Sequence, residues 1–63
     1  MSLTKRQREV LALLKTGKSD KEIARDLNAA VPTIKVHVSA ILRTMGVRNR
    51  TQAAVMASIG VPI

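Results

Sequence analysis

The feature that most constrains this chain is the stretch TIKVHVSAILRTM at residues 33–45. On a helix, apolar side chains three and four positions apart fall on one face. The residues that share this spacing are Ile34, Val38, Ile41, Leu42 and Met45. Because the resulting stripe is broad enough to bury against other helices, the stretch predicts a helix packed within a helical domain.

The opposite face of this predicted helix carries Val36, Ser39 and Arg43, with Lys35 at its edge. One interpretation is a solvated face with a stray valine, since single apolar residues are common on surfaces. The other is a face that enters the DNA major groove. There a valine packs on a thymine methyl, while lysine, arginine and serine reach base edges and phosphates. This stretch alone favours neither interpretation.

Length and charge narrow the kinds of partner. The 63 residues suffice for one domain with a small core, and a hydrophobic fraction of 46% is normal for a folded one. Eleven Lys and Arg residues against four acids give a net charge of +7. Such an excess favours a polyanionic partner, either nucleic acid or an anionic membrane surface.

Several residue types are missing or scarce. Without Phe, Trp or Tyr the chain offers no platform for unstacked bases, which counts against single-stranded nucleic acid. One histidine, His37, and four acids are too few for a catalytic or metal site. No cysteine, signal peptide or membrane-length apolar run occurs. We therefore expect a cytoplasmic, non-enzymatic protein that needs no cofactor or metal. Double-stranded DNA becomes the preferred polyanionic partner, ahead of a membrane surface.

Helix start and stop signals predict four helices and an all-α fold. Three starts carry a capping-box pattern, in which a polar cap is followed three residues later by Glu or Gln: Thr4 with Gln7, Ser19 with Glu22, and Asn49 with Gln52. Pro32 suits the first turn of the third helix, at about residues 31–45. Asn28 is a plausible left-handed end of the second helix, so the second and third helices form a helix-turn-helix pattern.

The first turn of the first predicted helix is crowded by Lys5, Arg6 and Arg8. Positive charge at a helix N-terminus opposes the helix dipole. Cations near free backbone N–H groups are what a phosphate contact uses, and we take Arg6 as a candidate for such a contact. A solvated surface turn explains any one of these cations equally well.

Three segments together carry a family resemblance: LTKRQREVLALL, SDKEIARDLN and TIKVHVSAILRTMGVRNRTQAA. They resemble the C-terminal DNA-binding domain of LuxR-type regulators, also called the NarL/FixJ or GerE type, over residues 3–60. The resemblance implies a four-helix helix-turn-helix domain whose third helix lies in the major groove. It further implies base contacts from Lys35, Val36 and Ser39 and phosphate contacts from Lys21, Thr33 and Arg50.

The resemblance also implies a homodimer through the fourth helix. Ala53, Ala54 and Ala57 would pack inward and leave Val55, Met56 and Ile59 as an exposed apolar strip. The reverse arrangement, with the large residues inside, stays open. Because the strip is small, we expect weak pairing of the isolated chain.

Family members usually carry a receiver or ligand-binding domain upstream. We therefore expect a C-terminal fragment of a longer bacterial transcriptional regulator, of the two-component response-regulator type. We also expect residues 1 and 2 to be a start remnant and the tail from Gly60 to be loose.

One departure from the family pattern is Ala30, where a Ser or Thr usually caps the third helix. Losing such a cap costs ~1 kcal/mol. A second departure is Ala29, where the family has a larger aliphatic residue.

Two alternative functions stay open beside sequence-specific DNA binding. A sigma-factor-like promoter-reading domain has a similar helix-turn-helix, but the capped fourth helix beginning NRTQAA argues against it. A cationic bundle that binds proteins or membranes is disfavoured by the three capped helix starts, which are typical of a folded globule.

Overall fold

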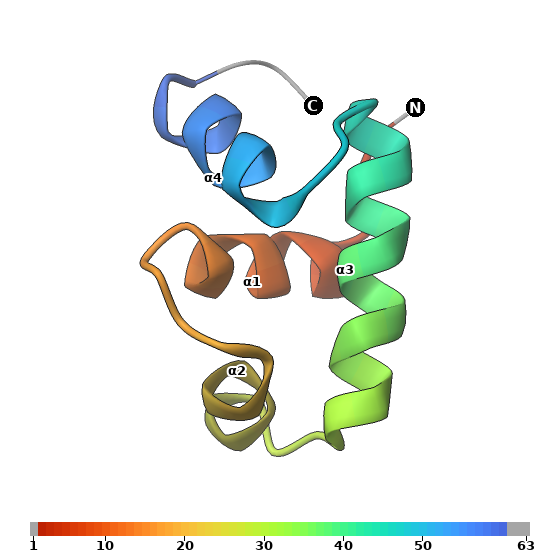
Figure 1. Ribbon diagram of the computed structural model, residues 1–63. Coiled ribbons are helices and arrows are strands. Elements are labelled where there is room, and N and C mark those ends of the chain that lie inside the picture. The colour runs from red at the N-terminus through yellow and green to blue at the C-terminus, as the bar shows by residue number, and fades with distance from the viewer. Residues whose placement is uncertain (1, 61–63) are drawn as a thin grey trace.

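The computed structural model describes residues 2–60 and consists of four helices. They are α1 (Lys5–Leu14), α2 (Asp20–Asp26), α3 (Val31–Met45) and α4 (Arg50–Ser58). In Figure 1 the long helix α3 runs along one side, α1 lies across it, and α4 and α2 lie on opposite sides of α1. The predictions of an all-α fold and of a third helix at residues 31–45 are confirmed.

Two of the predicted capping boxes are present. The Thr4 hydroxyl accepts from the N–H of Gln7 at 3.1 Å, and Gln7 Oε1 accepts from the N–H of Thr4 at 3.0 Å. Ser19 and Glu22 form the same pair of bonds at 3.2 and 3.0 Å. These bonds satisfy backbone donors that a helix start leaves free. At α3, by contrast, Ala30 occupies the N-cap position without a side-chain bond.

The predicted capping box at the start of α4 is half wrong. Asn49 Oδ1 accepts from the N–H of Gln52 at 2.9 Å, as expected. Gln52 Oε1, however, accepts from the N–H of Arg48 at 2.8 Å instead of from that of Asn49. Asn49 has φ −151°, against −69° at Thr4. This more extended backbone turns the N–H of Asn49 away and brings the preceding N–H within reach.

The turn between α2 and α3 is short because α2 ends in a left-handed residue. Asn28 has φ 53°, a conformation that asparagine tolerates better than most side chains. The N–H of Ala29 donates back to the carbonyl of Ala24 at 2.8 Å, and that of Asn28 to Arg25 at 3.2 Å. This pair of bonds is a Schellman motif, which holds the chain direction into α3.

The core lies between α1 and α3 and is closed by α2 and α4. It contains only apolar side chains: Leu3, Val10, Leu11, Leu14, Ile23, Ala24, Ile34, Val38, Ile41 and Ala53. Helix α1 packs against the other three helices and α3 against α2 and α4, whereas the described parts of α2 and α4 do not pack against each other. Each helix therefore contributes one buried face and keeps another for solvent.

Met1 and the tail residues 61–63, for which a start remnant and a loose end were expected, lie outside the described residues. Ser2 is exposed. No helix within residues 2–60 has the length and apolar character needed to cross a membrane.

Candidate nucleic-acid interface

The two faces predicted for α3 are both present. Ile34, Val38 and Ile41 are buried in the core, whereas the opposite face is open to solvent. Four exposed side chains form this outward face, which we call the α3 face: Lys35, Val36, Ser39 and Arg43. Val36 keeps 68% of its surface exposed, so nothing in the described chain covers this β-branched side chain.

The cations of the α3 face are free to bind an external anion. Within residues 2–60, neither Lys35 nor Arg43 forms an ion pair or a side-chain hydrogen bond. Lys21 and Arg25 on α2 are also exposed and unpaired there. Thr33, in the first turn of α3, is exposed as well. The α3 face therefore combines two cations, one hydroxyl and one apolar side chain, which is chemistry suited to DNA.

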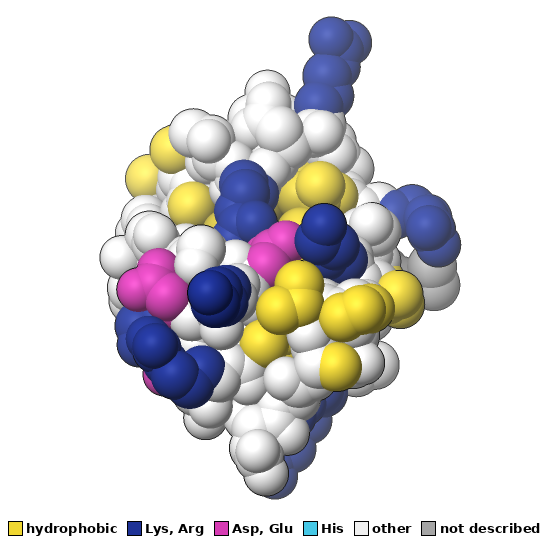
Figure 2. Space-filling view, turned by 60° about the horizontal axis from the view of Figure 1, so that its bottom comes forward, with side chains coloured by type: hydrophobic (Ala, Val, Ile, Leu, Met, Phe, Trp, Pro, Cys, Tyr) yellow, Lys and Arg dark blue, Asp and Glu magenta, His cyan; other side chains and the backbone are white. Residues whose placement is uncertain are grey.

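The four carboxylates are each engaged within the chain. Three form ion pairs: Glu9 with Arg6, Asp26 with Lys18, and Asp20 with Arg50. The fourth, Glu22, closes the capping box of α2. Figure 2 accordingly shows acidic side chains set among several Lys and Arg side chains on one face of the molecule. The surplus cations point to solvent, so the net charge of +7 is expressed at the surface.

The carboxyl of Glu22 has a pKa below its ordinary value of 4.5. The main cause is the hydrogen bond from the backbone N–H of Ser19, followed by the bond with the Ser19 side chain; Arg25 and Lys18 add favourable charge. Glu22 therefore stays ionised at the start of α2, where a negative charge also suits the helix dipole.

Both arginines predicted to contact phosphate, Arg50 and Arg6, donate hydrogen bonds to α2 or to residues next to its ends. Arg50 donates from Nη1 to Asp20 Oδ1 at 2.6 Å and from Nη2 to the carbonyl of Lys18 at 2.9 Å. Arg6 donates from Nη1 to Glu9 Oε2 and from Nη2 to the carbonyl of Leu27, both at 3.1 Å. A guanidinium carries five N–H donors, so each arginine keeps donors beyond the two used here.

No pattern in the sequence indicates the partners of Arg50. By its position Asp20 suits a helix start, where acids are common, and Lys18 belongs to no motif. The pair spans 30 residues, so no local spacing rule connects its members. An acid at the start of α2 is explained by the helix dipole alone, so its presence does not indicate that it also pairs with a distant arginine.

The alanines of α4 face inward, as the family resemblance implied. Ala53 is fully buried, and Ala54 and Ala57 are partly buried against the core. Val55 and Ile59 keep 55% and 71% of their surfaces exposed. The reverse arrangement, with the large residues inside, is therefore wrong for these two. Met56 differs from both because it is half-buried.

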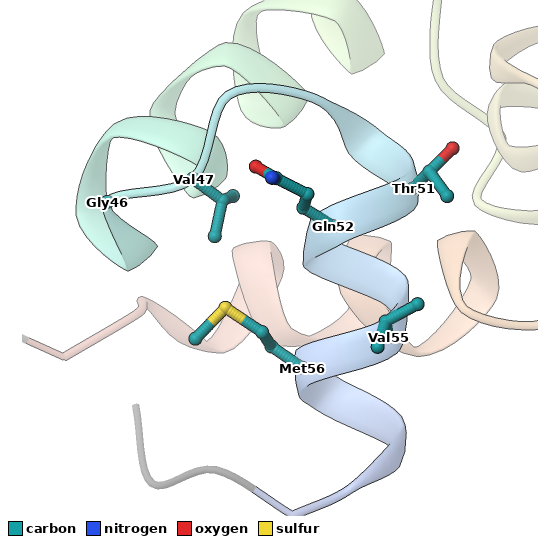
Figure 3. Close-up of a pocket in the computed structure, with 6 residues that line it drawn as sticks. All are labelled: Gly46, Val47, Thr51, Gln52, Val55 and Met56. Carbon is teal, nitrogen blue, oxygen red and sulfur yellow. The ribbon is translucent and has the colours of Figure 1, made fainter.

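An open groove of about 420 Å³ runs beside α4. Its lining residues are Gly46, Val47, Thr51, Gln52, Val55 and Met56. In Figure 3 the side chains of Gln52 and Met56 lie on the side of α4 that faces Val47, whereas Thr51 and Val55 point to the other side. Met56 is half-buried because its side chain lies on the side of α4 that faces Val47.

Residues 1–57 match the family described as bacterial regulatory proteins, luxR family. The chain belongs to the LuxR family of bacterial regulatory proteins. With this assignment, the LuxR-type helix-turn-helix in the structure is a DNA-binding domain of a transcriptional regulator.

Relatives in several bacteria are similar to this LuxR-family chain. It is 50% identical over 58 residues to YhjB of Escherichia coli (strain K12), whose name classes it as an HTH-type transcriptional regulator; the match covers 92% of this chain and 29% of YhjB. Identity to the transcriptional regulatory protein LiaR of Bacillus subtilis is 48% over 56 residues, with 89% and 26% covered. The response regulator protein VraR of Staphylococcus aureus is 44% identical over 55 residues, with 87% and 26% covered. The chain thus spans between a quarter and a third of the length of these relatives.

His37 lies half-buried on α3. Within residues 2–60, no group of three or more His, Asp or Glu side chains is placed to hold a metal ion.

Proposed function

We propose that this LuxR-family domain reads double-stranded DNA sequence-specifically, with α3 in the major groove. The observation that carries the proposal is the exposed Val36 on the α3 face, flanked by the unpaired cations Lys35 and Arg43. A groove supplies a thymine methyl for the valine, which water cannot replace, and base and phosphate acceptors for the cations. Ser39 lies on the same face and contacts a base directly or through water.

Phosphate contacts from α2 and its surroundings position this helix. Lys21 on α2 and Thr33 in the first turn of α3 are exposed and have no competing partner among the described residues. Arg50 and Arg6 are proposed as further phosphate contacts through the donors that their bonds to the protein leave free. These contacts supply affinity without sequence information.

The domain acts, in this proposal, as the DNA-binding part of a longer, cytoplasmic two-component response regulator. Support comes from relatives such as VraR, which is named a response regulator and of which the matched region is 26%. The remaining three quarters of such a relative leave room for a separate regulatory domain.

Two copies pair through α4 in the proposed DNA complex. Val55 and Ile59 are one helical turn apart and exposed, and Met56 lies beside them over the groove. The same patch on each subunit buries its counterpart around a two-fold axis, which places two copies of α3 in successive major grooves. Because the patch is small, the free domain stays mostly monomeric at low concentration.

The test of groove reading is Val36→Ala, assayed on a duplex with one preferred half-site and on a random duplex. We expect affinity for the preferred half-site to fall by about 1–3 kcal/mol, with little change for the random duplex, because only a base contact depends on sequence. Val55→Ala is the matched control, since it makes the same change at another exposed position and a duplex with one half-site does not use the proposed dimer contact. Equal weakening of both duplexes by Val36→Ala would show that α3 does not read the groove through this residue.

A further inference from the structure

Helices α2 and α4 are joined by a side chain and not by helix packing. Figure 1 shows them on opposite sides of α1. Arg50, the first residue of α4, reaches across to Asp20, the first residue of α2, at 2.6 Å and to the carbonyl of Lys18 at 2.9 Å. The side chains of Arg50 and Asp20 are 38% and 21% exposed, so this charge-assisted pair is partly shielded from water.

The other end of α2 is held in a comparable way. Arg6 of α1 donates to the carbonyl of Leu27, the C-cap residue of α2, at 3.1 Å. Carbonyls at a helix C-terminus lack an intrahelical partner, so a guanidinium there satisfies an acceptor as well as linking two helices. Glu9, which pairs with Nη1 of the same arginine, keeps the guanidinium oriented.

Helix α2 packs on α1 and α3 through only a small buried surface. It has seven residues, and only Ile23 and Ala24 are fully buried in the core. Two turns of helix are marginal on their own, because most helical stability in proteins comes from packing. The Schellman turn at Asn28 then transmits the direction of α2 into α3.

We propose that Arg50 and Arg6 are positioning residues for sequence reading, in addition to the phosphate contacts proposed for them. By holding α2 at both ends, they set the angle at which the helix-turn-helix meets the duplex. Asp20 becomes a determinant of specificity through Arg50, although a carboxylate does not itself bind DNA phosphate. This role rests on the proposed reading of the groove by α3.

Positioning and phosphate contact have different signatures in binding data. Loss of a phosphate contact weakens all duplexes alike and lowers the salt dependence. Loss of positioning lowers the ratio of specific to random affinity. Asp20→Asn separates the two, because removing a negative charge near DNA by itself strengthens binding to every duplex.

The experiment measures the affinity of the 63-residue chain for its preferred duplex and for a shuffled duplex over a range of salt concentrations. The preferred duplex is selected from a random pool with the unmodified chain. We expect Asp20→Asn to lower the specific-to-random ratio on the order of tenfold, the loss of one charged hydrogen bond. Glu22→Gln is the matched control: it removes the same charge two residues later and keeps a capping-box side chain, so its ratio should stay unchanged.

A second pair of variants tests the other end of α2. Arg6→Met should lower the ratio, whereas Arg8→Met should not, because the exposed side chain of Arg8 has no hydrogen bond or ion pair to the rest of residues 2–60. If Asp20→Asn fails to fold by circular dichroism, Arg50→Lys takes its place, because a lysine keeps the charge but cannot bond to both Asp20 and Lys18 in the fork geometry.

The outcomes are distinct. The positioning role would be overturned if Asp20→Asn and Glu22→Gln had the same specific-to-random affinity ratio. It would also be overturned if a folded Arg50→Lys kept the ratio of the unmodified chain. Either result would leave groove reading intact. An unmodified chain that shows no preference between selected and shuffled duplexes would instead overturn the proposed function itself.

Discussion

The charged side chains of this domain divide into acids that are all engaged within the chain and a surplus of cations that is not. All four carboxylates have partners within the chain, through three ion pairs and one capping box. Exposed cations such as Lys21, Lys35 and Arg43 have none within the described residues. Since unpaired surface charges act together on a polyanion, this division makes DNA binding strongly dependent on salt.

A first prediction at the residue scale concerns the uncapped start of α3. Ala30 has φ −82° and ψ 147°, the extended conformation of an N-cap, and its side chain is exposed. Ala30→Ser should therefore stabilise the domain by ~1 kcal/mol, which raises the melting temperature by roughly 4–8 °C. Ala12→Ser, at an exposed position inside α1, is the control and should be neutral or slightly destabilising. Equal melting temperatures for the two variants would exclude a capping effect.

A second prediction concerns acid. The native hydrogen bonds of Glu22 hold the pKa of its carboxyl below 4.5. A lowered native pKa contributes stability that is present above the unfolded-state value and is lost as pH falls through the native value. Thermal unfolding between pH 7 and pH 3 should show the stability advantage of the unmodified chain over Glu22→Gln shrinking below about pH 4.5. A difference that stays constant over this range would contradict the assigned cause.

At the scale of elements, α3 and α4 each combine a packed face with an apolar residue that nothing in the described chain covers. In α3 that residue is Val36, and in α4 the pair is Val55 and Ile59. The buried face of α4 consists of alanines, of which Ala53 is fully buried, and the larger Val55 and Ile59 stay exposed. Exposed apolar side chains mark contact sites. The proposed DNA surface would use the one on α3, and the proposed subunit surface would use those at α4.

The proposed dimer surface on α4 gives the next prediction. Val55→Glu and Ile59→Glu should leave the helical circular dichroism spectrum unchanged, because both positions are exposed. Cooperative binding to a duplex with two half-sites should be lost, since two like charges would face each other across the two-fold axis. Ala12→Glu, exposed on α1, introduces the same charge elsewhere and should keep cooperativity. Cooperativity that survives in folded Val55→Glu would place the dimer surface on another element.

For the whole molecule, the dominant property is a net charge of +7 on a domain whose extents are 27 × 20 × 19 Å. At ~0.01 M salt the Debye length of about 30 Å is comparable to these extents, so cations on any helix then contribute to the field that attracts DNA. Only a cation that touches a phosphate releases a counterion from the DNA. A salt titration therefore separates cations that contact phosphate from cations that merely lie near the DNA.

The corresponding prediction compares two exposed lysines. Lys21→Gln should weaken binding to all duplexes alike and lower the log–log salt slope by about 0.9, the value of one phosphate contact. Lys15→Gln, at the C-cap of α1, removes the same charge at a position for which no phosphate contact is proposed, and the slope should not change. Equal slopes for the two variants would exclude Lys21 as a phosphate contact.

Much of this structure follows from local patterns in the sequence. Helical periodicity separated Ile34, Val38 and Ile41 from the α3 face, because which side of a helix a residue occupies depends only on its spacing from its neighbours. Capping at Thr4 and Ser19 and the left-handed turn at Asn28 likewise involve residues within a few positions of each other.

The tertiary structure decided the features that depend on distant residues or on backbone direction. The Arg50–Asp20 pair and the bond from Arg6 to Leu27 form only when α1, α2 and α4 are packed, so no spacing in the chain predicts them. Gln52 bonds to Arg48 because of the backbone angle at Asn49, and Met56 is half-buried beside Val47 because the α3–α4 loop folds back there. Local chemistry thus determined the helices and their faces, while packing determined which side chains connect the helices, because those contacts exist only in three dimensions.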